Sequence, residues 1–308
     1  MSIGFPRRVV QLVSLACAVS GIGGAQAARV QHTVTADGHA LALWEKRAAR
    51  PTRAVLLLHG RTWSSVPDFD LEVAGEHRSL MDALVAKGYA VYALDLRGYG
   101  GTPRDGTGWD TPNRSAEDLA AALRWIAANS GLAGKPAVLG WSNGSTVAQL
   151  CAQLHPGLMS DLMLVGYWKD PDATIAPVAD TVKPARVPTT AEAAASDFIA
   201  PHAISKRALA AYVAAALKSD PVRTDWRRME EYNALDAAKV RVPTLLIQGE
   251  LDPIAPTVVQ AKFFARLANP DRQWVVLAGG DHAALLEETQ PAFVAAVVAF
   301  LERPHWKP

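Results

Sequence analysis

The chain has 308 residues, of which half are hydrophobic and a fifth are charged. This composition is typical of a globular protein with one large core or two smaller ones. The formal net charge is only +1 at pH 7, and no run of basic residues is present. The charge therefore gives no reason to expect a nucleic acid or an anionic membrane surface as a partner.

The first residues differ from the rest. Arg7 and Arg8 precede an apolar run over residues 9–22, and residues 25–27 form an A-x-A sequence. This pattern predicts a secretory signal peptide over residues 1–27, with cleavage after Ala27 and a periplasmic or secreted product. A membrane-anchoring helix is the alternative, but the apolar run is shorter than the ~20 residues that a span requires. We therefore expect no stable membrane anchor after cleavage.

Removing the leader leaves one cysteine, Cys151, which cannot form an intramolecular disulfide. It lies in a helical pattern, and we expect it to be a small buried residue.

Strand-like and helix-like segments alternate along the rest of the chain. The first two strands are joined by an Asp37-Gly38 turn and form a hairpin, and the later strands are nearly continuous aliphatic runs. The expected strands cover residues 30–35, 40–45, 54–58, 90–94, 137–139, 162–165, 244–248 and 273–277. The expected helices cover residues 80–87, 115–128, 145–154, 258–267 and 291–301, with Ser115 as an N-cap. This alternation predicts an α/β fold with a mostly parallel sheet and helices on both faces.

One region breaks the alternation. Residues 167–242 contain no clear strand, but they include helical patterns at 205–217 and 225–232. A structureless loop of this length is improbable in a compact domain. We expect an inserted helical cap or lid over 167–242, and a core domain formed by residues 28–166 and 243–308.

Ser142 lies at the junction of an apolar strand and a helix, within the sequence Gly-Trp-Ser-Asn-Gly. A G-x-S-x-G motif in this position forms a strained turn that presents the serine hydroxyl above the sheet. Gly140 and Gly144 leave room for that turn. Ser142 is therefore our candidate nucleophile.

A serine nucleophile needs a base and a residue that orients the base. Asp252 and His282 each follow the end of a later strand, in the chain order Ser, acid, His. We expect His282 to be the base and Asp252 to be its partner. Glu250, two residues closer to its strand, is the alternative acid, and Asp281 could also compete.

The turn also predicts where the oxyanion is stabilised. One donor should be the backbone N–H of Asn143, and a second should come from the loop His59–Thr62, most directly from Arg61. We expect His59 to brace this loop through hydrogen bonds. Aromatic residues of the loops and the cap are candidates for an apolar substrate pocket, namely Trp63, Trp141, Trp168 and Trp226.

The whole set of motifs resembles the α/β-hydrolase superfamily, in its capped serine-hydrolase branch. The matching stretches are LLLHG (56–60), DLRGYGGT (95–102), GWSNG (140–144), QGELDPI (248–254) and GGDHAALLE (279–287). The resemblance implies an eight-stranded sheet, a Ser-Asp-His triad and a helical cap between the sixth and seventh strands. It also implies that Asp95 and Arg97 shape a loop and are not catalytic.

These residues predict acyl transfer to water without a metal or an organic cofactor. A carboxylesterase acting on a small-molecule ester is the first expectation. The alternatives are a proline-iminopeptidase-like peptidase, a C–C bond hydrolase, and a thioesterase or acyltransferase with the same triad. A peptidase of that type needs a carboxylate in the cap for the free amine, and Glu230 and Glu231 are candidates. A non-catalytic binding protein is disfavoured because all three triad residues are present. The sequence does not indicate the oligomeric state.

Overall fold

The computed structural model describes residues 1, 27–179 and 183–304. The signal-peptide prediction rests mainly on residues 2–26, which lie outside the described part of the chain. Within the described residues, no helix is both long and apolar enough to cross a membrane.

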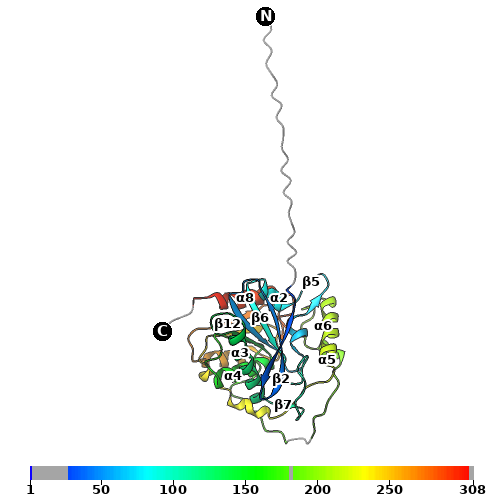
Figure 1. Ribbon diagram of the computed structural model, residues 1–308, viewed down its shortest axis with the longest axis vertical. Coiled ribbons are helices and arrows are strands. Elements are labelled where there is room, and N and C mark those ends of the chain that lie inside the picture. Colours follow the sequence, from blue (N-terminus) through cyan, green and yellow to red (C-terminus); the bar gives the residue numbers. More distant parts are fainter. Residues whose placement is uncertain (2–26, 180–182, 305–308) are drawn as a thin grey trace.

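A single large sheet forms the centre of the molecule (Figure 1). The sheet has eight strands, the number that the resemblance implied, and they lie in the order β1-β2-β6-β3-β8-β9-β11-β12. The first two strands pair antiparallel to their neighbours, and all other pairs are parallel. The strands are β1 (Val30–Ala36), β2 (His39–Arg47), β3 (Arg53–Leu58), β6 (Tyr89–Leu94), β8 (Ala137–Trp141), β9 (Leu162–Val165), β11 (Thr244–Gly249) and β12 (Arg272–Leu277). The predicted mostly parallel α/β sheet is confirmed.

Helices cover both faces of this sheet. One face packs against α3 (Pro112–Asn129), α4 (Asn143–Leu154) and α7 (Thr257–Arg266), and the other against α2 (Leu80–Val85) and α8 (Gln290–Glu302). Strand residues alternate between the two cores, as Leu56 and Leu58 face one and Val55 and Leu57 the other. This alternation follows from the two-residue period of a strand, which points successive side chains to opposite faces.

The helix α3 begins three residues earlier than the sequence predicted. Its N-cap is Thr111, whose side chain accepts a hydrogen bond from the N–H of Arg114, and Pro112 occupies the first turn. A proline fits there because its missing N–H has no partner in the first turn of a helix. Ser115, the expected N-cap, lies inside the helix and donates its hydroxyl to Asp110.

Residues 167–242, called the cap segment below, connect β9 to β11. Its described part contains α5 (Ala191–Ala195), α6 (Lys206–Ser219), the short strand β10 (Asp225–Trp226) and the 3-10 turns η1 (Met229–Ala234) and η2 (Ala237–Lys239). The helix expected over 225–232 is therefore wrong, because β10 pairs with the short strand β7 (Trp109–Asp110) of the core.

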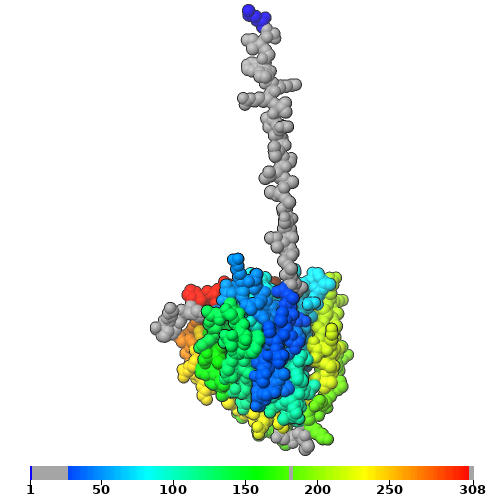
Figure 2. Space-filling model, in the orientation of Figure 1, coloured from blue at the N-terminus to red at the C-terminus, as the bar shows by residue number. Residues whose placement is uncertain are grey.

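The helices of the cap segment form one side of the molecule. Figure 2 shows α6 along this side, next to the hairpin of β4 (Glu72–Val73) and β5 (Glu76–His77). Buried residues of α6 and of α1 (Ser65–Phe69) share a core with the central strands.

Candidate active site

Ser142 occupies a strained turn between β8 and α4. Its backbone has φ of 55° and ψ of −119°, a conformation that is costly for a residue with a side chain. Its N–H donates to the carbonyl of Val165 at 2.9 Å, which ties the turn to the end of β9. The flanking glycines are required, because a Cβ on Gly140 would lie 2.3 Å from the carbonyl oxygen of Gly144, and one on Gly144 would lie 2.4 Å from that of His59.

His282 and Asp252 meet beside this turn. The Nδ1 atom of His282 lies 2.9 Å from Oδ2 of Asp252, and each residue is only 4% exposed. The other oxygen of Asp252 accepts the N–H groups of Ile254 and Ala255 at 2.8 and 3.1 Å. The carboxylate is thereby fixed by its own loop, and it leaves one oxygen for the histidine.

Gly166 brings the serine and the histidine into one site. It follows Val165, the residue bonded to Ser142, and a Cβ on it would lie 2.8 Å from the His282 ring and 3.4 Å from Asp252. Its φ of +56° also favours glycine. The histidine ring therefore packs directly on bare backbone at the end of β9.

The two rival acids have other partners. Glu250 accepts the N–H of Gly279 at 2.9 Å on the exposed side of its loop. Asp281 binds the cap segment, because its Oδ2 accepts the N–H groups of Ile199 and Ala200, each at 2.6 Å. The structure therefore brings Asp252 to His282 and gives neither rival a hydrogen bond to the histidine ring.

The loop His59–Thr62 lies against the serine. A Cβ on Gly60 would be 3.5 Å from that of Ser142. The ring of His59 accepts the N–H of Leu96 at Nε2, so Nδ1 must carry the hydrogen that it donates to the carbonyl of Gly60 at 2.8 Å. Burial lowers the pKa of His59, which keeps the ring neutral in this tautomer. The brace expected of His59 is thus present.

Two backbone donors beside Ser142 are unused. The N–H groups of Arg61 and Asn143 have no acceptor among residues 27–179 and 183–304. The N–H of Arg61 belongs to the same peptide as the Gly60 carbonyl that His59 holds, so the orientation of that peptide is fixed. Both groups can donate to an anion that forms near Ser142.

An acidic pair on the cap side of the site, formed by the buried Asp68 and the half-buried Asp197, was not predicted from the sequence. The hydroxyl of Tyr212 lies 3.0 Å from Asp68 and 3.2 Å from Asp197. One hydroxyl hydrogen cannot serve two ionised carboxylates, so one carboxyl must be protonated when both bonds form. Burial raises the pKa of Asp68 well above its usual range, and we assign the proton to it. Burial also raises the pKa of Asp197, while the nearby charge of His282 acts in the opposite direction.

The four predicted pocket tryptophans have different surroundings. Trp63 is 2% exposed and lies beside Asp197. Trp141 is also buried, and its Nε1 donates to the backbone carbonyl of His282 at 2.7 Å, so it supports the histidine loop. Trp226 donates to the hydroxyl of Tyr99, and Trp168 packs edge-on against Tyr232 of the cap segment. Trp63, Trp168 and Trp226 remain pocket candidates, whereas Trp141 has a supporting position.

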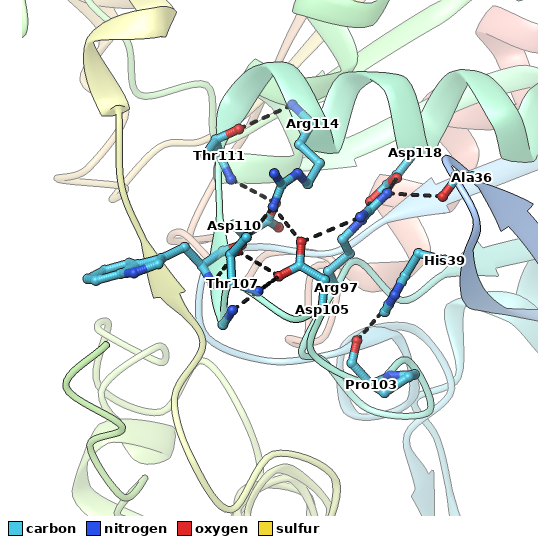
Figure 3. Close-up of polar contacts among 12 residues, drawn as sticks. Ala36, His39, Arg97, Pro103, Asp105, Thr107, Asp110, Thr111, Arg114 and Asp118 are labelled. Carbon is cyan, nitrogen blue, oxygen red and sulfur yellow. Dashed lines mark hydrogen bonds and ion pairs between the residues drawn. The ribbon is translucent and has the colours of Figure 1, made fainter. Parts of the chain in front are cut away.

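Asp95 and Arg97 hold loops together, as the resemblance implied. Asp95 accepts the N–H groups of Ser65 and Gly101, both at 2.9 Å. Arg97 binds both oxygens of Asp118, each at 2.8 Å, and also donates to the carbonyl of Ala36 (Figure 3).

No group of three or more metal-ligating side chains with suitable geometry occurs in the part of the chain that the structure describes. The predicted burial of Cys151 is confirmed.

Comparison with known proteins agrees with this architecture. Residues 49–289 match the family described as serine aminopeptidase, S33. No protein of curated function matches the sequence significantly. Among solved structures, a serine hydrolase involved in carbazole degradation is 20% identical, with a TM-score of 0.65 over 89% of this chain and 99% of that chain.

Two further structures show the range of relatives. E-2-(acetamidomethylene)succinate hydrolase is 19% identical, with a TM-score of 0.60 over 90% of this chain and all of that chain. The thioesterase domain from the curacin biosynthetic pathway is 17% identical, with a TM-score of 0.62 over 88% and 99% of the two chains. At these identities the structures show a shared fold. Because the family match spans most of the chain, the protein belongs to the S33 serine aminopeptidase family of the α/β-hydrolase superfamily.

Proposed function

We propose that the protein is a serine hydrolase that cleaves carboxylic esters through an acyl-enzyme. The observation that carries this proposal is the strained Ser142 turn beside the His282–Asp252 pair, with two unused backbone N–H groups next to it. A nucleophile, an oriented base and donors for the oxyanion are the three parts that acyl transfer requires.

Each residue has a defined step in this reaction. The Oγ of Ser142 attacks the ester carbonyl carbon while Nε2 of His282 takes its proton. Asp252, bonded to Nδ1, holds the ring in the required tautomer and stabilises its positive charge. The negative charge on the carbonyl oxygen is stabilised by the N–H groups of Arg61 and Asn143. The protonated His282 then gives its proton to the departing alcohol, and water repeats the cycle on the acyl-enzyme.

Aromatic side chains of the cap segment lie beside Asn143. Tyr232 donates its hydroxyl to the side chain of Asn143 at 3.0 Å, and Trp168 packs against Tyr232. Trp63, which is 2% exposed, directly follows the loop His59–Thr62. This lining supports esters of small or medium apolar acids.

Covalent labelling tests the proposal directly. A fluorophosphonate should phosphonylate Ser142 in the wild type and give no adduct in Ser142→Ala. His282→Ala should slow labelling by at least about 10³-fold, because the base and the nucleophile act as a unit. His155→Ala is the matched control, since that histidine lies at the C-terminal end of α4, away from Ser142, and pairs with Glu117 of α3. Equal labelling of the His282 and His155 variants would refute the mechanism.

An aminopeptidase activity is a second candidate, and Asp197 favours it. This carboxyl belongs to the cap segment, lies close enough to His282 for the charge of that ring to oppose the rise in its pKa, and has no lysine or arginine bonded to it in the described structure. It could therefore hold the free amine of a substrate. Glu231, one of the earlier candidates, is less suitable because it accepts the N–H of Asn113 at the start of α3.

A substrate panel separates the candidates. Hydrolysis of p-nitrophenyl acetate to octanoate should be faster than that of proline p-nitroanilide. If the anilide is preferred, and Asp197→Asn raises its KM without changing that of p-nitrophenyl butyrate, the aminopeptidase is correct. An acyl-CoA substrate and a vinylogous diketone in the same panel test the thioesterase and C–C hydrolase alternatives, whose catalytic residues are the same.

We also propose that the protein is exported, on the basis of the pattern in residues 1–27. Cell fractionation with N-terminal sequencing of the mature product tests this. A product that retains residues 1–27 in the cytoplasm would contradict the proposal.

A further inference from the structure

The loop His59–Thr62 is held by side chains at three consecutive peptide groups. The N–H of Gly60 points to Oδ2 of Asp68 at 3.5 Å, and the carbonyl of Gly60 accepts from His59. The carbonyl of Arg61 accepts the hydroxyl of Tyr99. The peptide that carries the Arg61 N–H is therefore fixed on both sides by groups outside the loop.

Tyr99, one of these groups, is hydrogen-bonded to Trp226 of β10 in the cap segment. Trp226 donates its Nε1 hydrogen to the hydroxyl oxygen of Tyr99 at 2.7 Å. Tyr99 can donate to only one acceptor, and that acceptor is the carbonyl of Arg61. Because Trp226 occupies the oxygen of Tyr99 as a donor, it directs the single hydroxyl hydrogen toward the loop. Tyr99 also packs on the ring of His59, with ring centroids 4.4 Å apart.

Asp68, a second of these groups, is hydrogen-bonded to Tyr212 of α6 in the cap segment. The hydroxyl of Tyr212 lies 3.0 Å from Oδ1 of Asp68, whose other oxygen faces the N–H of Gly60. Both Tyr212 and Asp68 are fully buried, so this contact has no competition from water. Two elements of the cap segment, α6 and β10, therefore each bind the same loop through one residue of the core.

We propose that the cap segment positions the oxyanion-binding peptide Gly60–Arg61 through two hydrogen-bond chains, Trp226–Tyr99–Arg61 and Tyr212–Asp68–Gly60. Tyr99 and Asp68 are then positioning residues, which act on the reaction through the loop and do not touch the substrate. This inference rests on the proposed serine-hydrolase function. It makes the cap segment part of the catalytic geometry as well as a cover for the pocket.

The Trp226–Tyr99 chain gives the sharper test, because phenylalanine removes each polar atom and keeps most of the ring packing. Steady-state hydrolysis of p-nitrophenyl butyrate is measured for Tyr99→Phe, Trp226→Phe and the double variant. Tyr99→Phe should lower kcat about 10-fold, and Trp226→Phe about 3-fold, since a displaced oxyanion donor loses part of the 10²–10³-fold effect of a deleted one. KM of Tyr99→Phe should stay within about twofold, because Tyr99 does not touch the substrate. The double variant should match Tyr99→Phe alone, because Trp226 acts through Tyr99.

Tyr92→Phe is the matched control. Tyr92 is a buried tyrosine whose hydroxyl donates to Glu45 at 2.9 Å, in contact with neither the loop nor the cap segment through that bond. Its kcat should equal that of the wild type even if its melting temperature falls.

The outcomes separate the two proposals. If fluorophosphonate fails to label Ser142 of the wild type, the proposed function is wrong. If the wild type is labelled and active but Tyr99→Phe keeps full kcat, the positioning role is refuted. If the kcat losses of Tyr99→Phe and Trp226→Phe multiply in the double variant, Trp226 does not act through Tyr99, and the proposed hydrogen-bond chain is refuted. If Tyr99→Phe does not fold, a loss of kcat in folded Trp226→Phe supports the role and an unchanged kcat refutes it.

Discussion

The contact between Gly166 and His282 allows a quantitative prediction for Gly166→Ala. The added Cβ would lie 2.8 Å from Cε1 and 2.9 Å from Nδ1 of the histidine ring. Non-bonded carbon atoms prefer separations of about 3.5–4.0 Å, so the ring must move by about 0.7 Å. A movement of this size away from Asp252 stretches the 2.9 Å bond beyond hydrogen-bonding distance.

The expected result is a large loss of activity with a moderate loss of stability. Misplacing a catalytic group by about 1 Å costs on the order of 10²-fold in rate, so kcat for p-nitrophenyl butyrate should fall about 30- to 100-fold. The backbone φ of +56° costs a further 1–2 kcal/mol, roughly, in the free energy of unfolding once a side chain is present. Urea denaturation measures this second effect separately.

Gly131→Ala is the matched control for the backbone effect. Gly131 has φ of +69°, and a Cβ there would meet no atom within 4 Å. This variant should lose similar stability from its backbone conformation and keep wild-type kcat. If Gly166→Ala behaved like Gly131→Ala in both measurements, the packing of His282 on bare backbone would not matter for the reaction, and the reasoning would be refuted.

Three further predictions concern carboxyl groups. Asp252→Asn should lower kcat about 10⁴-fold by favouring the wrong tautomer of His282, whereas Glu250→Gln should change kcat less than about twofold. A larger loss of kcat in Glu250→Gln than in Asp252→Asn, measured in the ester assay, would make Glu250 the partner of the histidine. Burial raises the pKa of Glu287 to about 9. Between the unfolded pKa of about 4.3 and about pH 9, the folded state therefore holds a proton that the unfolded state has lost, and the free energy of unfolding falls as the pH rises through this window. Glu287→Gln should flatten this fall in melting temperature, and an unchanged slope would contradict it. Arg97→Met should lower the free energy of unfolding by about 3–5 kcal/mol because Asp118 stays buried without its partner, and urea denaturation of the double variant with Asp118→Leu should recover part of the loss.

The central sheet could be predicted because its signals are local. A strand such as β3 is buried on both faces from Ala54 to Leu58 and is therefore apolar over these residues. The alternation of such runs with amphipathic helices indicates parallel pairing without knowledge of any contact. Helix starts were less certain. The Thr-Pro sequence at residues 111–112 carried the start signal of α3, but a serine three residues later gave a similar one.

The cap segment was harder to predict because its order depends on distant partners. The two residues of β10 form a strand only by pairing with β7 of the core. No propensity of a two-residue segment can indicate such a pairing. The Asp68–Tyr212–Asp197 cluster was missed for the same reason, since its members come from three separate segments.

The acids around His282 show how hydrogen bonds assign different roles to one residue type. Asp281 precedes the histidine, yet Oδ1 accepts the N–H of Ala283 and Oδ2 accepts those of Ile199 and Ala200. Both of its oxygens are thus committed to backbone, and the residue ties the cap segment to the histidine loop. Asp252 commits only Oδ1 to backbone and keeps Oδ2 for the imidazole. Of these two aspartates, the one that can orient the histidine is the one with an oxygen to spare, and sequence distance from the histidine does not decide between them.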